Sequence, residues 1–182
     1  GIIAHYSQLS KVSPVDIILY NVPSRTSVNM SVETVVSLAE NYQNIVGIKE
    51  ASGNIEQCMD LVSSCPDDFM IISGDDKMTF PIMLLGGIGV ISVQAMAFPL
   101  LFSKMIQASL RGDIDLARKC HYELKKSVDL FYVNGNPSGI KEALYQLKIC
   151  SSNQVRLPLL PMNAEYAAKL NFQIQNTLSN KN

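Results

Sequence analysis

Two side chains in this sequence carry groups suited to chemistry on a carbonyl compound, and each ends a short apolar run. Lys49 closes the run at residues 44–49, and Tyr20 closes the run at residues 16–20. Burial disfavours the charged form of an amine, so a lysine in apolar surroundings can act as a neutral nucleophile and form a Schiff base with a carbonyl group. Lys49 is therefore a candidate covalent catalyst, and Tyr20 holds the equivalent position in another run.

Both residues also have a purely structural interpretation. A lysine at the end of an apolar strand can mark the point where the chain leaves the core and meets water, because lysine is seldom fully buried. Tyr20 can be a core aromatic residue whose hydroxyl group is satisfied by a hydrogen bond. The functional interpretation gains weight because two such groups lie at the same edge of adjacent predicted strands.

The segments that carry these residues predict a parallel α/β fold. Both runs are rich in β-branched and apolar residues and are bounded by turn residues, as buried strands are. Apolar residues at 32, 35, 36 and 39 predict a helix over 31–42, with Ser31 as its N-cap. A strand–helix–strand unit forms a parallel sheet, and sites in such folds are built at the carboxyl ends of the strands.

The same unit repeats along the first part of the chain. Predicted strands end at Tyr20, Lys49, Ser73 and Val93, and polar turns are predicted at 21–26 and 50–54. From about residue 113 the pattern becomes entirely helical, with predicted helices at 114–133, 138–147 and 163–178. The sequence thus predicts an α/β part at 1–112 and an all-helical part at 113–182.

The composition excludes several classes of function. The 182 residues carry a formal net charge of −1, which provides no basic surface for nucleic acid. No apolar stretch approaches the roughly 20 residues of a membrane span, and no signal peptide is visible. We therefore expect a cytoplasmic protein that binds neither nucleic acid nor a membrane.

The cysteines and histidines do not predict a metal site or disulfide bonds. The four cysteines form no CxxC pair, and the two histidines are far apart: Cys58, Cys65, Cys120 and Cys150, and His5 and His121. Free thiols in a reducing compartment are favoured over disulfides, and no zinc site is expected.

Four motifs, taken together and in order, carry a family resemblance. They are YNVPSRT at 20–26, GIKEASG at 47–53, SGDD at 73–76 and GGIGVIS at 86–92. The chain resembles the dihydrodipicolinate synthase family from residue 1 to about residue 178. The resemblance implies a partial (β/α)8 TIM barrel, with residues 1–112 as units five to eight and 113–182 as a helical C-terminal domain. A whole barrel takes about 200 residues or more, so the sequence departs from the family by lacking the first half of the barrel, and we expect that four units cannot close a barrel alone.

The resemblance also implies roles for individual residues. Lys49 matches the lysine that forms a Schiff base with pyruvate, and Tyr20 matches the tyrosine that relays protons. Arg25 matches the arginine that holds the carboxylate of aspartate semialdehyde through paired hydrogen bonds. Gly74 and the backbone of Ile91 match positions that contact pyruvate. No metal or organic cofactor is expected, because the lysine supplies the covalent attachment.

The activity implied by this resemblance is that of a lyase in lysine and diaminopimelate biosynthesis. Such an enzyme condenses pyruvate with aspartate semialdehyde to form 4-hydroxy-tetrahydrodipicolinate. The resemblance further implies a homo-oligomer, which is a tetramer in the family, located in the cytoplasm.

Three other interpretations stay open. A sister aldolase of the same barrel family, such as N-acetylneuraminate lyase or a 2-keto-3-deoxy-sugar-acid aldolase, would share Tyr20 and Lys49, although Arg25 favours the synthase. An inactive fragment is the second, because four strand–helix units leave open sheet edges and an uncovered apolar face. The third is a reactive thiol at Cys58 or Cys65, but neither has a histidine nearby in the sequence.

Overall fold

The structure, a computed structural model, describes residues 1–179 of the chain. These residues belong to two compact units, the first at Gly1–Ile91 and the second beginning at Ser92. The first unit contains every residue that the sequence assigns to the candidate site.

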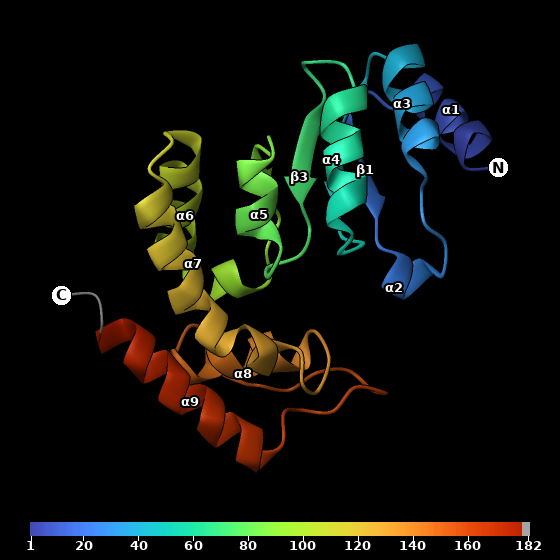
Figure 1. The fold of residues 1–182 in the computed structure, drawn as a ribbon. Coiled ribbons are helices and arrows are strands. Elements are labelled where there is room, and N and C mark those ends of the chain that lie inside the picture. The colour runs from blue at the N-terminus through green and yellow to red at the C-terminus, as the bar shows by residue number, and fades with distance from the viewer. Residues whose placement is uncertain (180–182) are drawn as a thin grey trace. The chain divides into compact units, whose positions relative to one another are not determined.

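The first unit is built on a four-stranded parallel sheet (Figure 1). The strands pair in the order β1-β2-β3-β4, and all three pairs are parallel. Every strand therefore presents its carboxyl end at the same edge of the sheet. The elements are α1 (Ile2–Val12), β1 (Ile17–Asn21), α2 (Pro23–Thr26), α3 (Val32–Asn41), β2 (Ile45–Glu50), α4 (Ile55–Ser64), β3 (Met70–Ser73), α5 (Thr79–Leu84) and β4 (Gly89–Val90).

The core of the first unit lies between one face of the sheet and the helices α3 and α4. Its buried cluster contains Leu19, Ile45, Ile48 and Ile71 from the strands, and Val35, Leu38 and Leu61 from the helices. Successive residues of a strand point to opposite faces, so β1 leaves Ile18 and Tyr20 exposed on the other face. That second face carries the candidate site.

Side-chain caps determine where α3 and α4 begin. The Ser31 hydroxyl accepts a hydrogen bond of 3.3 Å from the Thr34 N–H, which confirms the predicted N-cap. Oδ1 of Asn54 accepts hydrogen bonds from the N–H groups of Glu56 (3.0 Å) and Gln57 (3.2 Å). Such a cap satisfies N–H groups that have no partner inside the helix and contributes about 1 kcal/mol to stability.

Two segments of the first unit differ from the sequence-based prediction. Residues 23–26 were expected in a turn but form the short helix α2, because Pro23 has a φ that suits a first helical position and no N–H to satisfy. The fourth strand is predicted to end at Val93, but β4 ends at Val90. Val93 has helical dihedral angles (φ −82°, ψ −50°) because the 3₁₀ helix η1 (Gln94–Met96) begins directly after it.

The second unit is helical (Figure 1). It contains η1, α6 (Pro99–Leu110), α7 (Ile114–Val128), η2 (Asp129–Phe131), α8 (Ser138–Gln146) and α9 (Ala164–Ser179). The predicted helix at 114–133 is thus divided into α7 and η2. Helix α6 packs along α7, and α9 packs against α7, α8 and η2. Within residues 1–179, no helix has both the length and the apolar composition that a membrane crossing requires.

Close packing around Phe131 joins the elements of the second unit. The rings of Phe98 and Phe131 meet edge to face, with their centroids 6.2 Å apart and an interplanar angle of 83°. Gly139 at the start of α8 lies directly against the backbone of η2, because a Cβ added to it would be 2.2 Å from the Phe131 carbonyl oxygen. A larger residue at position 139 would therefore force α8 away from η2.

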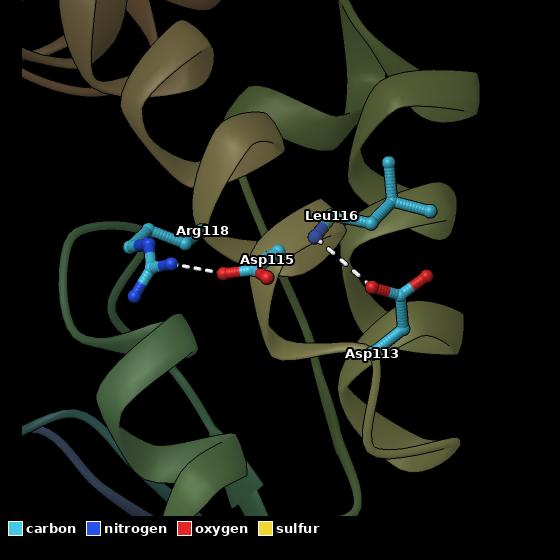
Figure 2. A network of polar contacts seen from close by, with 4 residues as sticks. All are labelled: Asp113, Asp115, Leu116 and Arg118. Carbon is cyan, nitrogen blue, oxygen red and sulfur yellow. Dashed lines mark hydrogen bonds and ion pairs between the residues drawn. The ribbon is translucent and has the colours of Figure 1, made fainter.

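Polar contacts mark the start of α7 (Figure 2). Oδ1 of Asp113 accepts a hydrogen bond of 3.1 Å from the Leu116 N–H and caps the helix. Asp115, in the first turn, forms an ion pair with Arg118. A carboxylate in the first turn is also favoured by the positive end of the helix dipole. These local contacts allow α7 to begin at Ile114, soon after α6 has ended at Leu110 and the chain has turned through Gly112.

The compact units do not divide where the sequence pattern changes. The sequence-based division places residues 99–110 in the α/β part, whereas the packing of α6 along α7 assigns them to the second unit. Local periodicity identifies α6 as a helix that follows a strand, but it contains no information about which neighbour the helix packs against. The division into functional parts at 1–112 and 113–182 stays a prediction.

Two residues of α4 provide a matched test of the core. Replacing Leu61, which is 0 % exposed, by alanine is expected to lower the free energy of unfolding by about 2–5 kcal/mol, because the substitution leaves a cavity. Replacing Met59, which is 43 % exposed on the same helix, is expected to change it by less than about 1 kcal/mol. Urea unfolding of both variants measures the difference, and equal losses would contradict the assigned orientation of α4.

Candidate functional site

Tyr20 and Lys49 lie side by side at the carboxyl edge of the sheet. β1 and β2 pair so that Tyr20 is directly opposite Lys49. The Nζ atom of Lys49 lies 4.0 Å from the centroid of the Tyr20 ring, a distance at which the ring face attracts a positive charge. Tyr20 is 46 % exposed, and Lys49 is half-buried. The first unit thus leaves both functional groups accessible to a small molecule.

The alternation of the strands explains why these two side chains share a face. Leu19 and Ile48 each precede one of them by one position, and both are fully buried in the core against α3 and α4. Successive side chains of a strand point to opposite faces, so Tyr20 and Lys49 project from the face that these helices do not cover. The sequence prediction that the two groups lie at the same edge of adjacent strands is confirmed by the strand register.

Gly74 lies against the side chain of Lys49. A Cβ added to Gly74 would be 2.7 Å from the Cβ of Ala51 and 3.0 Å from both Cγ and Cε of Lys49. Its N–H donates a hydrogen bond of 2.7 Å to the Glu50 carbonyl oxygen. Only a residue without a side chain fits between the end of β3 and the lysine, so Gly74 limits the space in which the Lys49 side chain can move.

Ile91 lies beside Ser73, the last residue of β3. The Ile91 N–H donates a hydrogen bond of 2.9 Å to the Ser73 carbonyl oxygen. The Ser73 side chain is buried, and its hydroxyl oxygen is 3.0 Å from the Thr79 hydroxyl oxygen. The Ser73 side chain therefore belongs to the buried end of the strand. Gly74 and Ile91 lie next to Ser73 at the edge of the sheet that carries Lys49.

Arg25 follows the end of β1 in the short helix α2, and its side chain is exposed. Its N–H donates a hydrogen bond of 2.8 Å to the Val22 carbonyl oxygen, which holds the backbone of the turn. Within residues 1–179, no hydrogen bond or ion pair joins the Arg25 guanidinium to Tyr20 or Lys49. The structure therefore brings Tyr20, Lys49 and Gly74 into contact, and it leaves Arg25 outside this group with its guanidinium free to meet an anion.

The described residues provide neither a cluster suited to a metal ion nor a reactive thiol near α4. No group of three or more histidine, cysteine, aspartate or glutamate side chains within residues 1–179 is placed to hold a metal. Burial, with a smaller contribution from Glu50, raises the pKa of Cys58 to about 11. Burial, with a smaller contribution from Glu40, raises the pKa of Cys65 to about 11. Both thiols are therefore poor sources of a thiolate nucleophile.

Sequence reasoning missed a buried polar cluster behind the site. Asn21 and Glu50 were expected in polar turns, but they are the last residues of β1 and β2, and each is 1 % exposed. The two residues are paired in register, and the Glu50 carboxylate accepts hydrogen bonds from the side chains of Asn21 and of Gln57 in α4. Strand alternation could have predicted part of this cluster. If β2 continues past Lys49, Glu50 must point to the opposite face, toward the helices.

Comparison with known proteins identifies the family to which these residues belong. Residues 1–177 match the model of the family described as "Dihydrodipicolinate synthetase family". The chain belongs to this family. A 4-hydroxy-tetrahydrodipicolinate synthase from Flavobacterium psychrophilum is 46 % identical over 172 residues, which are 94 % of this chain and 58 % of the relative. The family resemblance of the four sequence motifs is thereby confirmed.

Solved structures agree with this assignment. Dihydrodipicolinate synthase from Aquifex aeolicus superimposes with a TM-score of 0.93 at 36 % identity, covering 97 % of this chain and 60 % of that one. The chloride-inhibited enzyme from Acinetobacter baumannii, complexed with pyruvate, gives a TM-score of 0.92 at 31 % identity, with coverage of 97 % and 60 %. The chain thus spans less than two thirds of the length of these relatives, and its α/β fold matches part of their structures.

The raised pKa values of the two thiols predict slow alkylation. A pKa of about 11 at Cys58 and Cys65 lies well above the ordinary value of 9.0, so the folded chain contains fewer thiolates at pH 8 than an unfolded chain does. We expect iodoacetamide to modify both cysteines about 100-fold more slowly in the folded chain than in urea. Peptide mapping over time measures both rates, and similar rates in the two conditions would contradict the assigned environments.

Proposed function

We propose that this chain carries the imine-forming part of a lyase site that condenses pyruvate with aspartate semialdehyde to 4-hydroxy-tetrahydrodipicolinate. In this proposal Lys49 is the nucleophile and Tyr20 relays protons. Gly74 and the backbone of Ile91 line the site for pyruvate, and Arg25 binds the carboxylate of the second substrate. The proposal attaches pyruvate covalently to Lys49 and uses no metal or organic cofactor.

The observation that carries the proposal is the contact between Lys49 and Tyr20. The amine nitrogen lies 4.0 Å from the centroid of the tyrosine ring, and both residues lie at the carboxyl ends of adjacent parallel strands. Two such groups can act on one carbonyl carbon together. The proposal is further supported by the names of the relatives, and by the pyruvate present in the enzyme from Acinetobacter baumannii. Gly74 also supports the proposal, because a side chain at this position would crowd Lys49.

The first half of the reaction forms an enamine on Lys49. The neutral amine attacks the ketone carbon of pyruvate, and the carbonyl oxygen leaves as water once it has gained two protons. The resulting imine nitrogen is protonated and withdraws electrons from the neighbouring methyl group. Loss of one methyl proton to a base then gives the enamine. In this proposal Tyr20 carries the protons in these steps, which the contact between its ring and Nζ of Lys49 supports.

The second half of the reaction forms a carbon–carbon bond and releases the lysine. The enamine carbon attacks the aldehyde carbon of aspartate semialdehyde, and the aldehyde oxygen gains a proton. The imine nitrogen regains its positive charge in this step. The amino group of the bound semialdehyde then attacks the imine carbon, closes the ring and displaces Nζ of Lys49. Arg25 would hold the carboxylate of that substrate through paired hydrogen bonds.

We also propose the architecture that the resemblance implies. Residues 1–112 would be units five to eight of a (β/α)8 barrel, followed by a helical domain at 113–182. A four-stranded parallel sheet with a site at its carboxyl edge supports this assignment, since barrel enzymes build their sites at that edge. The homotetramer and the cytoplasmic location stay predictions.

Two alternatives to the proposed function differ in what they require of the site. A sister aldolase would form the same imine on Lys49 but would not need Arg25 for a second carboxylate. An inactive fragment would form no imine, because residues outside this chain would be required for the first step. The following two experiments separate these alternatives from the synthase.

Trapping with pyruvate and borohydride tests the first half-reaction. We expect a reduced pyruvate adduct on Lys49, found by intact mass and peptide mapping, because borohydride fixes an imine as a stable amine. Lys49→Arg should abolish the adduct, since a guanidinium keeps the charge but cannot form the imine. Tyr20→Phe keeps the ring and removes the hydroxyl, and it should slow trapping by about 100- to 10,000-fold. An adduct on a different lysine would refute the role of Lys49, and no adduct in a folded chain would favour the inactive fragment.

Arg25 distinguishes the synthase from a sister aldolase. Arg25→Ala should leave trapping of pyruvate unchanged and slow the consumption of aspartate semialdehyde by roughly 10- to 100-fold, because a charged hydrogen bond to the carboxylate is lost. The measurement is the consumption of the semialdehyde at saturating pyruvate. Arg111→Ala is the matched control, since Arg111 is an exposed arginine in the second unit. Equal rates for both variants would remove Arg25 from the proposed site.

A further inference from the structure

Glu50 is a buried carboxylate that directly follows Lys49 and is surrounded by hydrogen-bond donors. Its Oε2 atom accepts hydrogen bonds from Nδ2 of Asn21 at 2.8 Å and from Nε2 of Gln57 at 3.1 Å. Its Oε1 atom accepts a hydrogen bond of 2.6 Å from the Ser52 N–H. A buried carboxylate is costly unless it is well satisfied, and these three contacts satisfy it.

The partners of Glu50 are themselves held by other segments. Nδ2 of Asn21 also donates to Oδ1 of Asn29 at 2.7 Å, and Oδ1 of Asn21 accepts from the Met30 N–H at 3.0 Å. Oε1 of Gln57 accepts a hydrogen bond of 2.7 Å from Nδ2 of Asn29. The cluster therefore connects the ends of β1 and β2 to the segment before α3 and to the first turn of α4.

The cluster lies directly behind the candidate site. Asn21 and Glu50 form the register pair that follows the pair of Tyr20 and Lys49. Their side chains point toward the helices, whereas Tyr20 and Lys49 point to the open face. The backbone of the same two residues is also held, because the Asn21 carbonyl oxygen accepts a hydrogen bond of 2.9 Å from the Ala51 N–H. Any shift of β1 relative to β2 at this edge would break these contacts.

We propose that Glu50 is a positioning residue, and that its buried hydrogen bonds hold Lys49 against Tyr20 in the geometry required for imine formation. The claim that this geometry serves imine formation rests on the proposed function. The claim that Glu50 holds Lys49 against Tyr20 rests on the structure alone. Glu50 touches neither reacting group with its side chain, so it acts through the backbone of β2. The bonds from Asn21 and Ser52 both hold Glu50, the residue directly after Lys49.

A carboxylate is required at this position because every neighbour of Glu50 is a donor. In Glu50→Gln the side-chain amide has one acceptor oxygen and one NH₂ group. Whichever way it turns, the NH₂ group faces either the Ser52 N–H or the amide groups of Asn21 and Gln57. The variant keeps the shape of the side chain and loses at least one bond at the end of β2.

A matched control exists in the second unit. Glu142 of α8 is also a buried carboxylate that accepts hydrogen bonds from two side-chain amides. The donors are Nε2 of Gln146 at 2.7 Å and Nδ2 of Asn153 at 2.7 Å. Glu142→Gln repeats the chemical change of Glu50→Gln in a unit that holds none of the proposed site residues. It therefore reports any general effect of neutralising a buried carboxylate.

The first measurement follows the position of Lys49 without any reaction. In the full chain labelled with ¹³C-lysine, the Hε protons of Lys49 should resonate upfield of those of the other lysines, because Nζ lies 4.0 Å from the centre of the Tyr20 ring. Lys49→Arg assigns the signal, and Tyr20→Ala should remove its displacement. We expect Glu50→Gln to move the signal toward the other lysines and Glu142→Gln to leave it in place.

The second measurement is the rate of borohydride trapping as a function of pyruvate concentration. In Glu50→Gln we expect the maximal rate to fall by roughly 10- to 100-fold, with a smaller change in the half-saturating pyruvate concentration, because misplacement of a reacting group slows the covalent step. Glu142→Gln should match the unchanged chain. Circular dichroism establishes whether each variant is folded. If Glu50→Gln unfolds the chain, Gln57→Met is used in its place. This variant removes one donor to Glu50 and should lower the maximal rate by a smaller factor.

The outcomes separate the positioning role from the proposed function. If the unchanged chain gives the displaced Lys49 signal but no adduct, the proposed function fails, and the resonance of Glu50→Gln decides the positioning role. If folded Glu50→Gln, or folded Gln57→Met in its place, keeps both the displaced signal and the trapping rate, the positioning role is refuted. An unchanged chain whose Lys49 signal is not displaced also refutes it, because the contact to be held is then absent.

Discussion

Parallel pairing between β1 and β2 is the interaction on which the first unit depends. It places Tyr20 beside Lys49 on one face of the sheet and Asn21 beside Glu50 on the other. A shift by one residue would exchange these faces, because side chains alternate along a strand. The lysine would then enter the core, and the glutamate would leave its hydrogen-bond donors. The register is thus required by the core, by the buried cluster and by the candidate site at the same time.

Two opposite requirements meet at the ends of these strands. An imine-forming lysine must be reached by its substrate, and it must also be held in position. Glu50 supplies support from behind through the backbone, and Gly74 supplies it from the side through contact with the Lys49 side chain. In the proposed site the accessible amine is therefore supported both from behind and from the side.

The parts of the fold that follow from local rules could be predicted from the sequence. Helix α3 follows from its apolar periodicity and its cap, and the pairing of Tyr20 with Lys49 follows from two equivalent strand ends. The parts that were missed depend on contacts between distant segments. Asn21 and Glu50 resemble turn residues in the sequence. Their burial depends on an acceptor from Asn29 for Asn21 and a donor from Gln57 for Glu50, which no local pattern reveals. In the same way, the packing of α6 along α7 is a tertiary contact that local periodicity does not specify.

The ring of Tyr20 can contribute to the proposed reaction independently of its hydroxyl. Its face lies toward the nitrogen atom that becomes positively charged in the protonated imine. An aromatic face attracts a cation, and the attraction is stronger where water is partly excluded. The ring would therefore stabilise the charge that makes the imine an electron acceptor, while the hydroxyl transfers protons. A tyrosine at this position serves both steps, whereas a phenylalanine would keep only the electrostatic contribution and an aliphatic residue would keep neither.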